Sequence, residues 1–195
     1  MSGCYATRVS AVEQKPLRAD AARNREALIS AARTLFAQHG TEVPLQAIAK
    51  AAGVGQASLY RHFPDRESLI IAIFEENFTT MEATSARYAD SPDQFARVWT
   101  ELIDFSIDSK GFAGIVALND HPDERVVEMV ERLEALLSGP LQRAIAGGVV
   151  EAHWTVADLV LVVQMLSGAL AGVPLEQTRD VADAVLRLVG LDHIK

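Results

Sequence analysis

The chain of 195 residues is 49% hydrophobic and carries a formal net charge of −8, a composition that supports a sizeable core and excludes wholesale disorder. Its single cysteine, Cys4, cannot form an internal disulfide, which is typical of a protein that works in a reducing cytoplasm. The first 20 residues hold no apolar stretch of signal-peptide length. The most apolar later run, residues 158–173, is shorter than the ~20 residues of a membrane span. We therefore expect a cytoplasmic globular protein.

Charge is distributed unevenly along the chain. Residues 1–70 hold nine lysines and arginines against six carboxylates, a net of +3, whereas the remaining residues hold nine against twenty, a net of −11. A basic first third on an acidic body points to a polyanionic partner at one end. Chance together with acidic surface helices explains the same asymmetry, so charge alone leaves both interpretations open.

Helical spacing recurs through the chain and strand-like alternation is nearly absent, which predicts an all-α fold. The first helix is expected at residues 20–39, with Asp20 as its N-cap. A second helix is expected at residues 44–52. A third is expected at residues 56–62, where Pro64 prevents it from continuing.

Further helices are predicted downstream, and two of them begin with clear capping residues. Asp65 precedes one, and Thr155, with a carboxylate three residues on, precedes another. The expected ranges are 66–89, 92–108, 111–119, 122–138, 140–146, 156–171 and 175–190. We expect residues 1–17 to be a mobile arm, residues 18–75 a small helical domain, and residues 76–195 a larger one.

Residues 44–63 have the pattern of a helix-turn-helix. Gly53 and Gly55 lie in a turn that is tight enough to need glycine, and Leu59 and Phe63 would fix the second helix to a core. A helix of this width fits the major groove of B-DNA with its first residues at the base edges. The residues left on its other faces are Gln56, Ala57, Ser58, Tyr60, Arg61 and His62.

Two longer stretches carry a resemblance to a known family. They are "ALISAARTLFAQHG" and "PLQAIAKAAGVGQASLYRHFPDRESLI", which combine an alanine-rich first helix, an "IA…AGV" second helix and "SLYRHF" followed by a capped long helix. Over about residues 20–75 the chain resembles the N-terminal domain of TetR-family transcriptional regulators. The resemblance implies a helix-turn-helix DNA-binding domain followed by a larger helical domain for effector binding and dimerisation.

The resemblance also implies roles for single residues. The positions that match the family's base-facing residues are Gln56, Ala57 and Ser58. The positions that match its phosphate-contacting residues are Tyr60, His62 and Arg66. We expect Arg61 to contact a base or a phosphate, and Lys50 to face solvent or the DNA backbone. Taken singly, Tyr60 and His62 could equally be partly packed side chains, and Arg66 a solvated one.

The resemblance further implies a homodimer that pairs through its last two helices. Segment 156–171 is apolar almost all round, so it must be covered on more than one side. A buried central helix in a monomer satisfies the same pattern. The residues predicted at the dimer interface are Leu159, Val163, Leu166, Leu170, Val185 and Leu188.

The middle helices are expected to enclose a pocket for a small-molecule effector, although ordinary core packing explains most of the same residues. The predicted pocket residues are Phe78, Met81, Trp99, Phe105, Phe112 and Met165. The C-terminal half also loosely resembles a TetR subgroup called SbtR-like. It departs from that subgroup at Glu151 and His153, where a basic and an acidic residue are usual.

Catalytic and cofactor motifs are missing from the sequence, so we expect neither an enzyme nor a cofactor. "NDHPDE", residues 119–124, contains oxygen ligands for a hard metal, but a polar loop explains it more simply, and we expect no metal site. The expected function is that of a ligand-responsive repressor of transcription that binds a palindromic operator. One alternative is a helical small-molecule-binding protein or enzyme whose helix-turn-helix does not bind DNA. Another is an activator, because the position of the operator decides between activation and repression.

Overall fold

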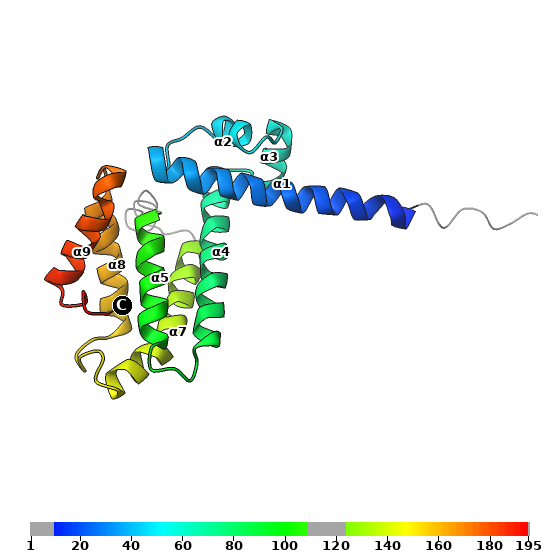
Figure 1. The fold of residues 1–195 in the computed structure, drawn as a ribbon. Helices are drawn as coiled ribbons and strands as arrows, with labels where there is room; N and C mark the ends of the chain where they lie inside the picture. The colour runs from blue at the N-terminus through cyan, green and yellow to red at the C-terminus, as the bar shows by residue number, and fades with distance from the viewer. Residues whose placement is uncertain (1–9, 109–123, 195) are drawn as a thin grey trace, which may run out of the picture.

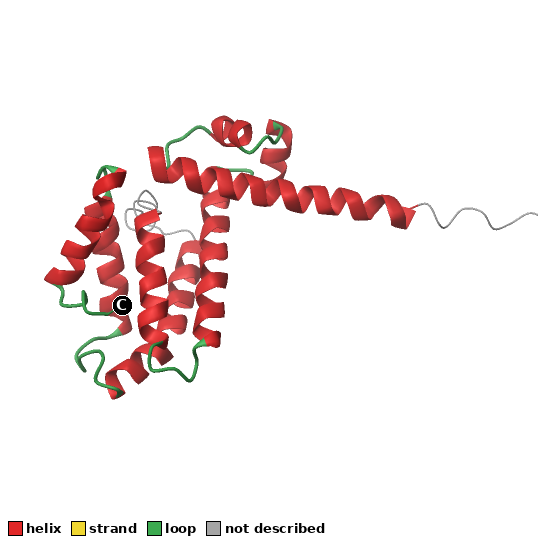
Figure 2. Ribbon diagram, in the orientation of Figure 1, coloured by secondary structure: helices red, strands yellow, loops and turns green. Residues whose placement is uncertain are grey.

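The computed structural model describes residues 10–108 and 124–194, all of whose regular elements are helical (Figures 1 and 2). This confirms the predicted all-α class. The helices are α1 (Ser10–His39), α2 (Leu45–Ala51), α3 (Gln56–His62), α4 (Arg66–Arg87), α5 (Gln94–Asp108), α7 (Glu124–Ala146), α8 (Val156–Leu170), the short 3-10 helix η1 (Leu175–Gln177) and α9 (Thr178–Leu188). Within these ranges, no helix is long and apolar enough to cross a bilayer.

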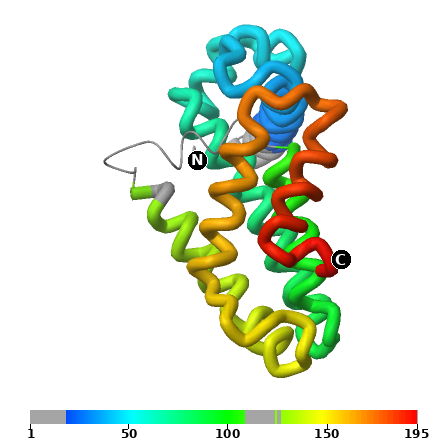
Figure 3. The backbone as a smooth tube through the Cα atoms, turned by 90° about the vertical axis from the view of Figure 1, so that its left-hand side faces the viewer, coloured from blue at the N-terminus to red at the C-terminus, as the bar shows by residue number. Residues whose placement is uncertain are grey.

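The molecule has two hydrophobic cores, which are joined by α4. Helices α1, α2 and α3 lie across one end of α4, and the rest of α4 runs into a bundle with α5, α7, α8 and α9 (Figures 1 and 3). The smaller core is built around Leu28, Ile48, Leu59 and Leu69, and the larger one around residues such as Trp99. Phe74 of α4 packs against both cores.

Several predicted helix boundaries are found where the local chemistry requires them. Asp65 caps α4 by accepting a hydrogen bond from the Ser68 backbone N–H at 2.6 Å. Thr155 and Asp158 form a capping box at the start of α8, in which each side chain accepts from the other residue's backbone N–H. Gly40 follows α1 with φ of +78°, a conformation that favours glycine.

Other boundaries differ from the prediction. α1 begins at Ser10 rather than near Asp20, whose carboxylate forms an ion pair with Arg23 on the same helix instead of capping it. The predicted arm therefore lies partly in α1 and partly outside the described residues. α7 continues through Pro140, where the prediction placed a break between two helices. A proline inside a helix costs about 3 kcal/mol, which burial of Leu137 and Leu141 on either side offsets.

Candidate DNA-binding surface and effector cavity

The turn between α2 and α3 has the geometry of a tight helix-turn-helix. Gly53 adopts φ of +65°, and its neighbour Val54 donates its backbone N–H to the Ala49 carbonyl at 2.9 Å. Gly55 is the N-cap of α3, and its carbonyl accepts a hydrogen bond from the Ser58 backbone N–H at 2.9 Å. Residues with a Cβ rarely adopt the Gly53 conformation, so glycine is favoured at this turn between the two helices.

Two apolar side chains anchor α3 and thereby decide which of its faces is free. Leu59 and Phe63 are each 1% exposed and belong to the smaller core. Burying a side chain of this size stabilises the fold by about 1.5–3 kcal/mol. Arg25 of α1 lies over the Phe63 ring at 4.8 Å from its centroid, a cation–π contact that holds α3 against α1.

The remaining residues of α3 face away from this core. Gln56, Ala57, Tyr60 and Arg61 are exposed, with Tyr60 at 47%, whereas Ser58 and His62 are half-buried. Lys50 is exposed in the last turn of α2. The structure therefore brings seven of the eight predicted DNA-contacting residues together on or beside α3.

The eighth predicted residue, Arg66, lies in the first turn of α4 and is half-buried. Its Nη1 donates a hydrogen bond to the Val43 carbonyl at 2.9 Å. Arg66 thus holds the segment that leads into α2, a supporting contact that the sequence did not indicate.

The charge of this surface favours an anionic partner. The chain has no carboxylate between Glu42 and Asp65, a stretch that includes Lys50, Arg61 and His62. Exposed cations without neighbouring acids attract phosphate through a field that salt weakens.

Comparison with known proteins agrees with this geometry. Residues 28–73 match the family model described as "Bacterial regulatory proteins, tetR family". The segment that holds α2 and α3 therefore matches the TetR family. It is 31% identical over 99 residues to the HTH-type transcriptional regulator SAB2452 of Staphylococcus aureus (strain bovine RF122 / ET3-1), a match that covers 48% of this chain and 54% of that protein. The chain spans about half the length of the curated relatives it matches.

Solved structures extend the likeness in fold over most of the chain. The TetR transcription regulatory protein from Mycobacterium vanbaalenii superposes with a TM-score of 0.59 at 26% identity, covering 87% of this chain and 98% of that one. LfrR from Mycobacterium smegmatis, solved in complex with proflavine, gives a TM-score of 0.58 at 21% identity, covering 88% and 96%. The second likeness shows the fold alone.

The larger domain contains a cavity of about 110 Å³ between α4, α5, α7 and α8. Three predicted pocket residues, Phe78, Met81 and Phe105, line it. Trp99 is instead 1% exposed and stacks on Phe95 in the core, away from this cavity. The other lining residues are Phe74, Asn77, Leu102, Ser106, Met129, Val130, Leu133, Val160, Val163, Gln164 and Ser167.

Two other predicted pocket residues do not line this cavity. Met165 is 50% exposed on the outer face of α8, because it follows Gln164, which faces the cavity, by one residue. Phe112 lies outside the described residues, as does most of the 119–124 segment.

The predicted dimer residues divide into an inward and an outward set. Leu159, Leu166 and Leu170 are each 0% exposed in the single chain, so their side chains cannot form the surface that a second copy meets. Val163 lines the cavity. Val185 is half-buried and Leu188 of α9 is 86% exposed.

The outer face of α8 is apolar. The residues of α8 that the sequence predicted at the dimer interface lie mostly on its inner face. Leu161 is 53% and Met165 50% exposed, and Gly168 and Ala169 continue the same stripe. A Cβ added to Gly168 would meet no atom within 4 Å, so its small size is not required by packing inside this chain. Such an exposed apolar stripe indicates an interaction surface.

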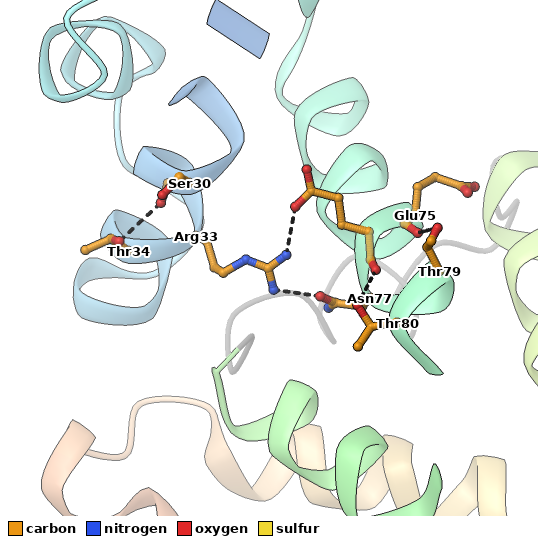
Figure 4. Close-up of polar contacts among 8 residues, drawn as sticks. Ser30, Arg33, Thr34, Glu75, Asn77, Thr79 and Thr80 are labelled. Atoms are coloured by element: carbon orange, nitrogen blue, oxygen red, sulfur yellow. Dashed lines mark hydrogen bonds and ion pairs between the residues drawn. The ribbon is translucent and has the colours of Figure 1, made fainter. Parts of the chain in front are cut away.

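Arginines tie α4 to its neighbours on two sides. Arg33 of α1 donates to the Asn77 Oδ1 at 2.6 Å and to the Glu76 Oε2 at 3.2 Å (Figure 4). Arg132 of α7 donates to both carboxylate oxygens of Glu82, at 2.8 and 2.9 Å. These residues link the cavity wall to the DNA-binding domain and to α7.

The Arg132 cluster perturbs the acidity of its members. Hydrogen bonds from Arg132 hold the pKa of the Glu82 carboxyl below its ordinary 4.5, against a smaller opposing effect of desolvation. The same bonds, together with one to Glu75 at 2.6 Å, raise the pKa of Arg132. Arg132 also lies 5.0 Å from the centroid of the Phe78 ring, so the cluster rests on the cavity wall.

Sequence reasoning missed Arg33, Asn77 and Arg132, although one signal was present. On the cavity face of α4, Phe74, Phe78 and Met81 follow helical spacing, and Asn77 is the polar residue among them. A polar residue on an apolar helix face needs a hydrogen-bond partner once it is buried.

Proposed function

We propose that this protein is a ligand-responsive repressor of transcription of the TetR family. As a homodimer it binds a palindromic operator, and a small molecule in the cavity releases it from DNA. The proposal also places the protein in the cytoplasm, where an operator is accessible. The observation that carries the proposal is the arrangement of α3. Two buried side chains fix this helix, and its other faces present polar groups in a stretch of the chain without carboxylates.

Recognition by α3 would follow from its residue types. Gln56 can donate and accept in the pattern of an adenine edge, and Arg61 can donate two hydrogen bonds to guanine. Ala57 offers only a methyl group, which suits the methyl of thymine. Lys50, Tyr60 and Arg66 would contact phosphates, which set orientation rather than sequence.

Dimerisation is supported by the exposed outer face of α8. The neighbouring helix α9 packs against α8 and exposes Leu188. Two copies that bury Leu161 and Met165 against each other would remove the exposed apolar stripe from water. A two-fold dimer then offers two α3 helices to half-sites about one turn of DNA apart.

Effector binding is supported by the cavity and by a neighbour of the same fold, LfrR, which was solved in complex with proflavine. An effector that binds one arrangement of α4 better than another shifts the equilibrium between DNA-competent and DNA-free dimers. Such couplings are typically about 1–3 kcal/mol.

Selection of bound fragments from random DNA tests the proposed function. We expect enrichment of a palindrome whose half-sites are centred about 10 bp apart. The control is the triple variant Gln56→Ala, Tyr60→Ala and Arg61→Ala, which alters only exposed side chains and should enrich nothing. Absence of retention of the unaltered protein on mixed genomic fragments at low salt would favour the alternative, a small-molecule-binding protein or enzyme with a non-functional helix-turn-helix.

A further inference from the structure

Asn77 is the buried polar residue that connects the cavity to the DNA-binding domain. It lines the cavity, is 3% exposed, and accepts the hydrogen bond from Arg33 of α1. We infer that Asn77 is the hydrogen-bond donor for the effector, and that the effector is a small, uncharged, mostly apolar molecule with an acceptor oxygen, such as a ketone. The inference rests on the proposed function, because it defines the ligand of that regulator.

The orientation of the Asn77 amide follows from its partner. A guanidinium can only donate hydrogen bonds, so the amide oxygen must face Arg33 and the NH₂ group must point elsewhere. Among the residues that the structure describes, Nδ2 has no hydrogen-bond partner, although it is buried. A buried donor without a partner is destabilising, so a ligand acceptor that reaches Nδ2 from the cavity would supply a hydrogen bond that the free protein lacks.

The other polar residues that line the cavity are Ser106, Gln164 and Ser167, all uncharged. The Ser106 hydroxyl donates its proton to the Leu102 carbonyl at 2.7 Å, so it can only accept from a ligand. None of the described lining residues is charged. Because burying an unpaired ion is very costly, the cavity should reject charged molecules.

The volume of the cavity suits an effector of about one ring. A dry apolar cavity of ~150 Å³ holds benzene, and this one measures about 110 Å³. Met81 and Met129 line it, and flexible thioether side chains adapt to rings of different shape.

The two ends of Asn77 connect ligand binding to the position of α1. Hydrogen bonds in a chain polarise one another, so an acceptor on Nδ2 changes the bond between Oδ1 and Arg33. Arg33 belongs to the helix against which α3 is held. By linkage, occupancy of the cavity changes DNA affinity, and DNA changes ligand affinity by the same factor.

Two probes of nearly equal shape test the ligand class. Cyclohexanone carries an exocyclic oxygen where methylenecyclohexane carries a CH₂ group, and cyclohexylammonium carries a charge. Calorimetry on the DNA-free protein gives the ratio of ketone to alkene affinity. We expect this ratio to fall about tenfold when Asn77 loses its donor, because a tenfold change in affinity corresponds to the loss of about one hydrogen bond. We also expect no binding of cyclohexylammonium.

The key variant is Asn77→Asp, which keeps the shape and the hydrogen bond to Arg33 but replaces the NH₂ donor with an acceptor. Asn77→Leu, an apolar residue of similar size, provides a second reading if the carboxylate disturbs folding, and circular dichroism checks both. In the unaltered protein, cyclohexanone should also shift the side-chain amide ¹⁵N resonance of Asn77. A ketone preference that persists in both variants, or an unshifted resonance, would overturn the inference.

A matched pair of variants tests the coupling. Arg33→Met removes the bond to Asn77 and should leave the ketone preference intact while cyclohexanone no longer weakens DNA binding. Glu76→Gln alters the second partner of Arg33 and keeps the Asn77 contact, so the effect of ketone on DNA affinity, about fivefold or more, should persist. An unchanged effect in Arg33→Met would contradict the role of this contact.

Different results would contradict the role of Asn77 in ligand binding and the proposed DNA-binding function. If the unaltered protein retains DNA fragments but binds cyclohexanone and methylenecyclohexane with the same preference as Asn77→Leu, the inference fails and the proposed function stands. If the unaltered protein retains no DNA at low salt, the proposed function fails, whatever the calorimetry shows.

Discussion

At the scale of single residues, the candidate DNA-binding surface separates side chains that read bases from those that hold the helix in place. Gln56 and Arg61 project from α3 with few neighbours, whereas Leu59 and Phe63 fix its rotation. Arg66 has one donor on the Val43 carbonyl and is not simply a solvated side chain. Substitutions at these positions should therefore have different signatures.

Replacing Gln56 or Arg61 with alanine should relax base preference at one position of each half-site. The loss should be about 1–3 kcal/mol for the preferred base, with folding unaffected because both side chains are exposed. Binding to a panel of operators with single substitutions measures this. Equal loss for every base at every position would assign these residues to the phosphate backbone instead.

Replacing Arg66 with alanine should weaken binding to all DNA sequences about equally and lower the salt dependence of binding. Because its Nη1 bond to Val43 is also lost, thermal stability should fall as well, by about 1.5–3 kcal/mol for a hydrogen bond to a charged group. Lys50→Ala is the control, since Lys50 is exposed and should lower salt dependence without a change in melting temperature. A changed base preference in Arg66→Ala would contradict this role.

At the scale of elements, α4 is the helix that joins the two hydrophobic cores. It receives Arg33 from α1 and Arg132 from α7, and its apolar face lines the cavity. The bidentate bond between Arg132 and Glu82 makes the α4–α7 contact dependent on pH. It contributes stability while Glu82 is ionised, which holds above its unfolded pKa near 4.5 and is lost as the pH falls below its lowered folded pKa.

The variant Glu82→Gln should therefore flatten the acid limb of the stability curve. Chemical unfolding at a series of pH values should show the original protein losing stability below about pH 4.5, with a shallower slope in the variant. Glu131→Gln changes an exposed carboxyl on α7 and serves as the control. A steeper acid limb in Glu82→Gln would show that the carboxyl is not stabilised by Arg132.

The elements themselves were largely predictable from sequence, and the contacts between them were not. Helix ends marked by Asp65 and Thr155 were found because capping is local chemistry. The start of α1 and the continuity of α7 through Pro140 were missed because packing overrode local signals there.

In the candidate site, too, residues close in sequence were predicted together and contacts between distant residues were not. The helix-turn-helix residues share one short segment, so local pattern brought them together. Met165 was predicted to line the cavity and Leu159 to lie at the dimer interface. Both predictions were wrong because a helix that is apolar on all sides does not reveal which of its faces points inward. The structure places Met165 on the outer face and Leu159 inside. Arg33 and Asn77 are 44 residues apart, and no local pattern reveals such a pair.

At the scale of the whole molecule, the exposed stripe on α8 is the feature that a single chain leaves unexplained. Leu161 and Met165 together form the kind of apolar surface that proteins cover with a partner. The proposed partner is a second copy, because two recognition helices are needed to span a palindrome.

The double variant Leu161→Glu and Met165→Glu should be monomeric, because four carboxylates would be buried at the two-fold interface. Each chain should still fold, since both side chains are about half exposed in it. Sedimentation measures the mass, and affinity for a palindrome should fall toward that for a single half-site. Leu175→Glu, at a residue that is 51% exposed on η1, is the control. A dimeric double variant would place the interface elsewhere.

Phe74 packs against both hydrophobic cores, and its helix runs through each of them. Unfolding of either core therefore removes packing contacts from the other. The two halves should denature in a single cooperative transition instead of two separate ones. Amide protons in the middle of α4 should exchange only through global opening, at the same rate as the slowest protons of both halves.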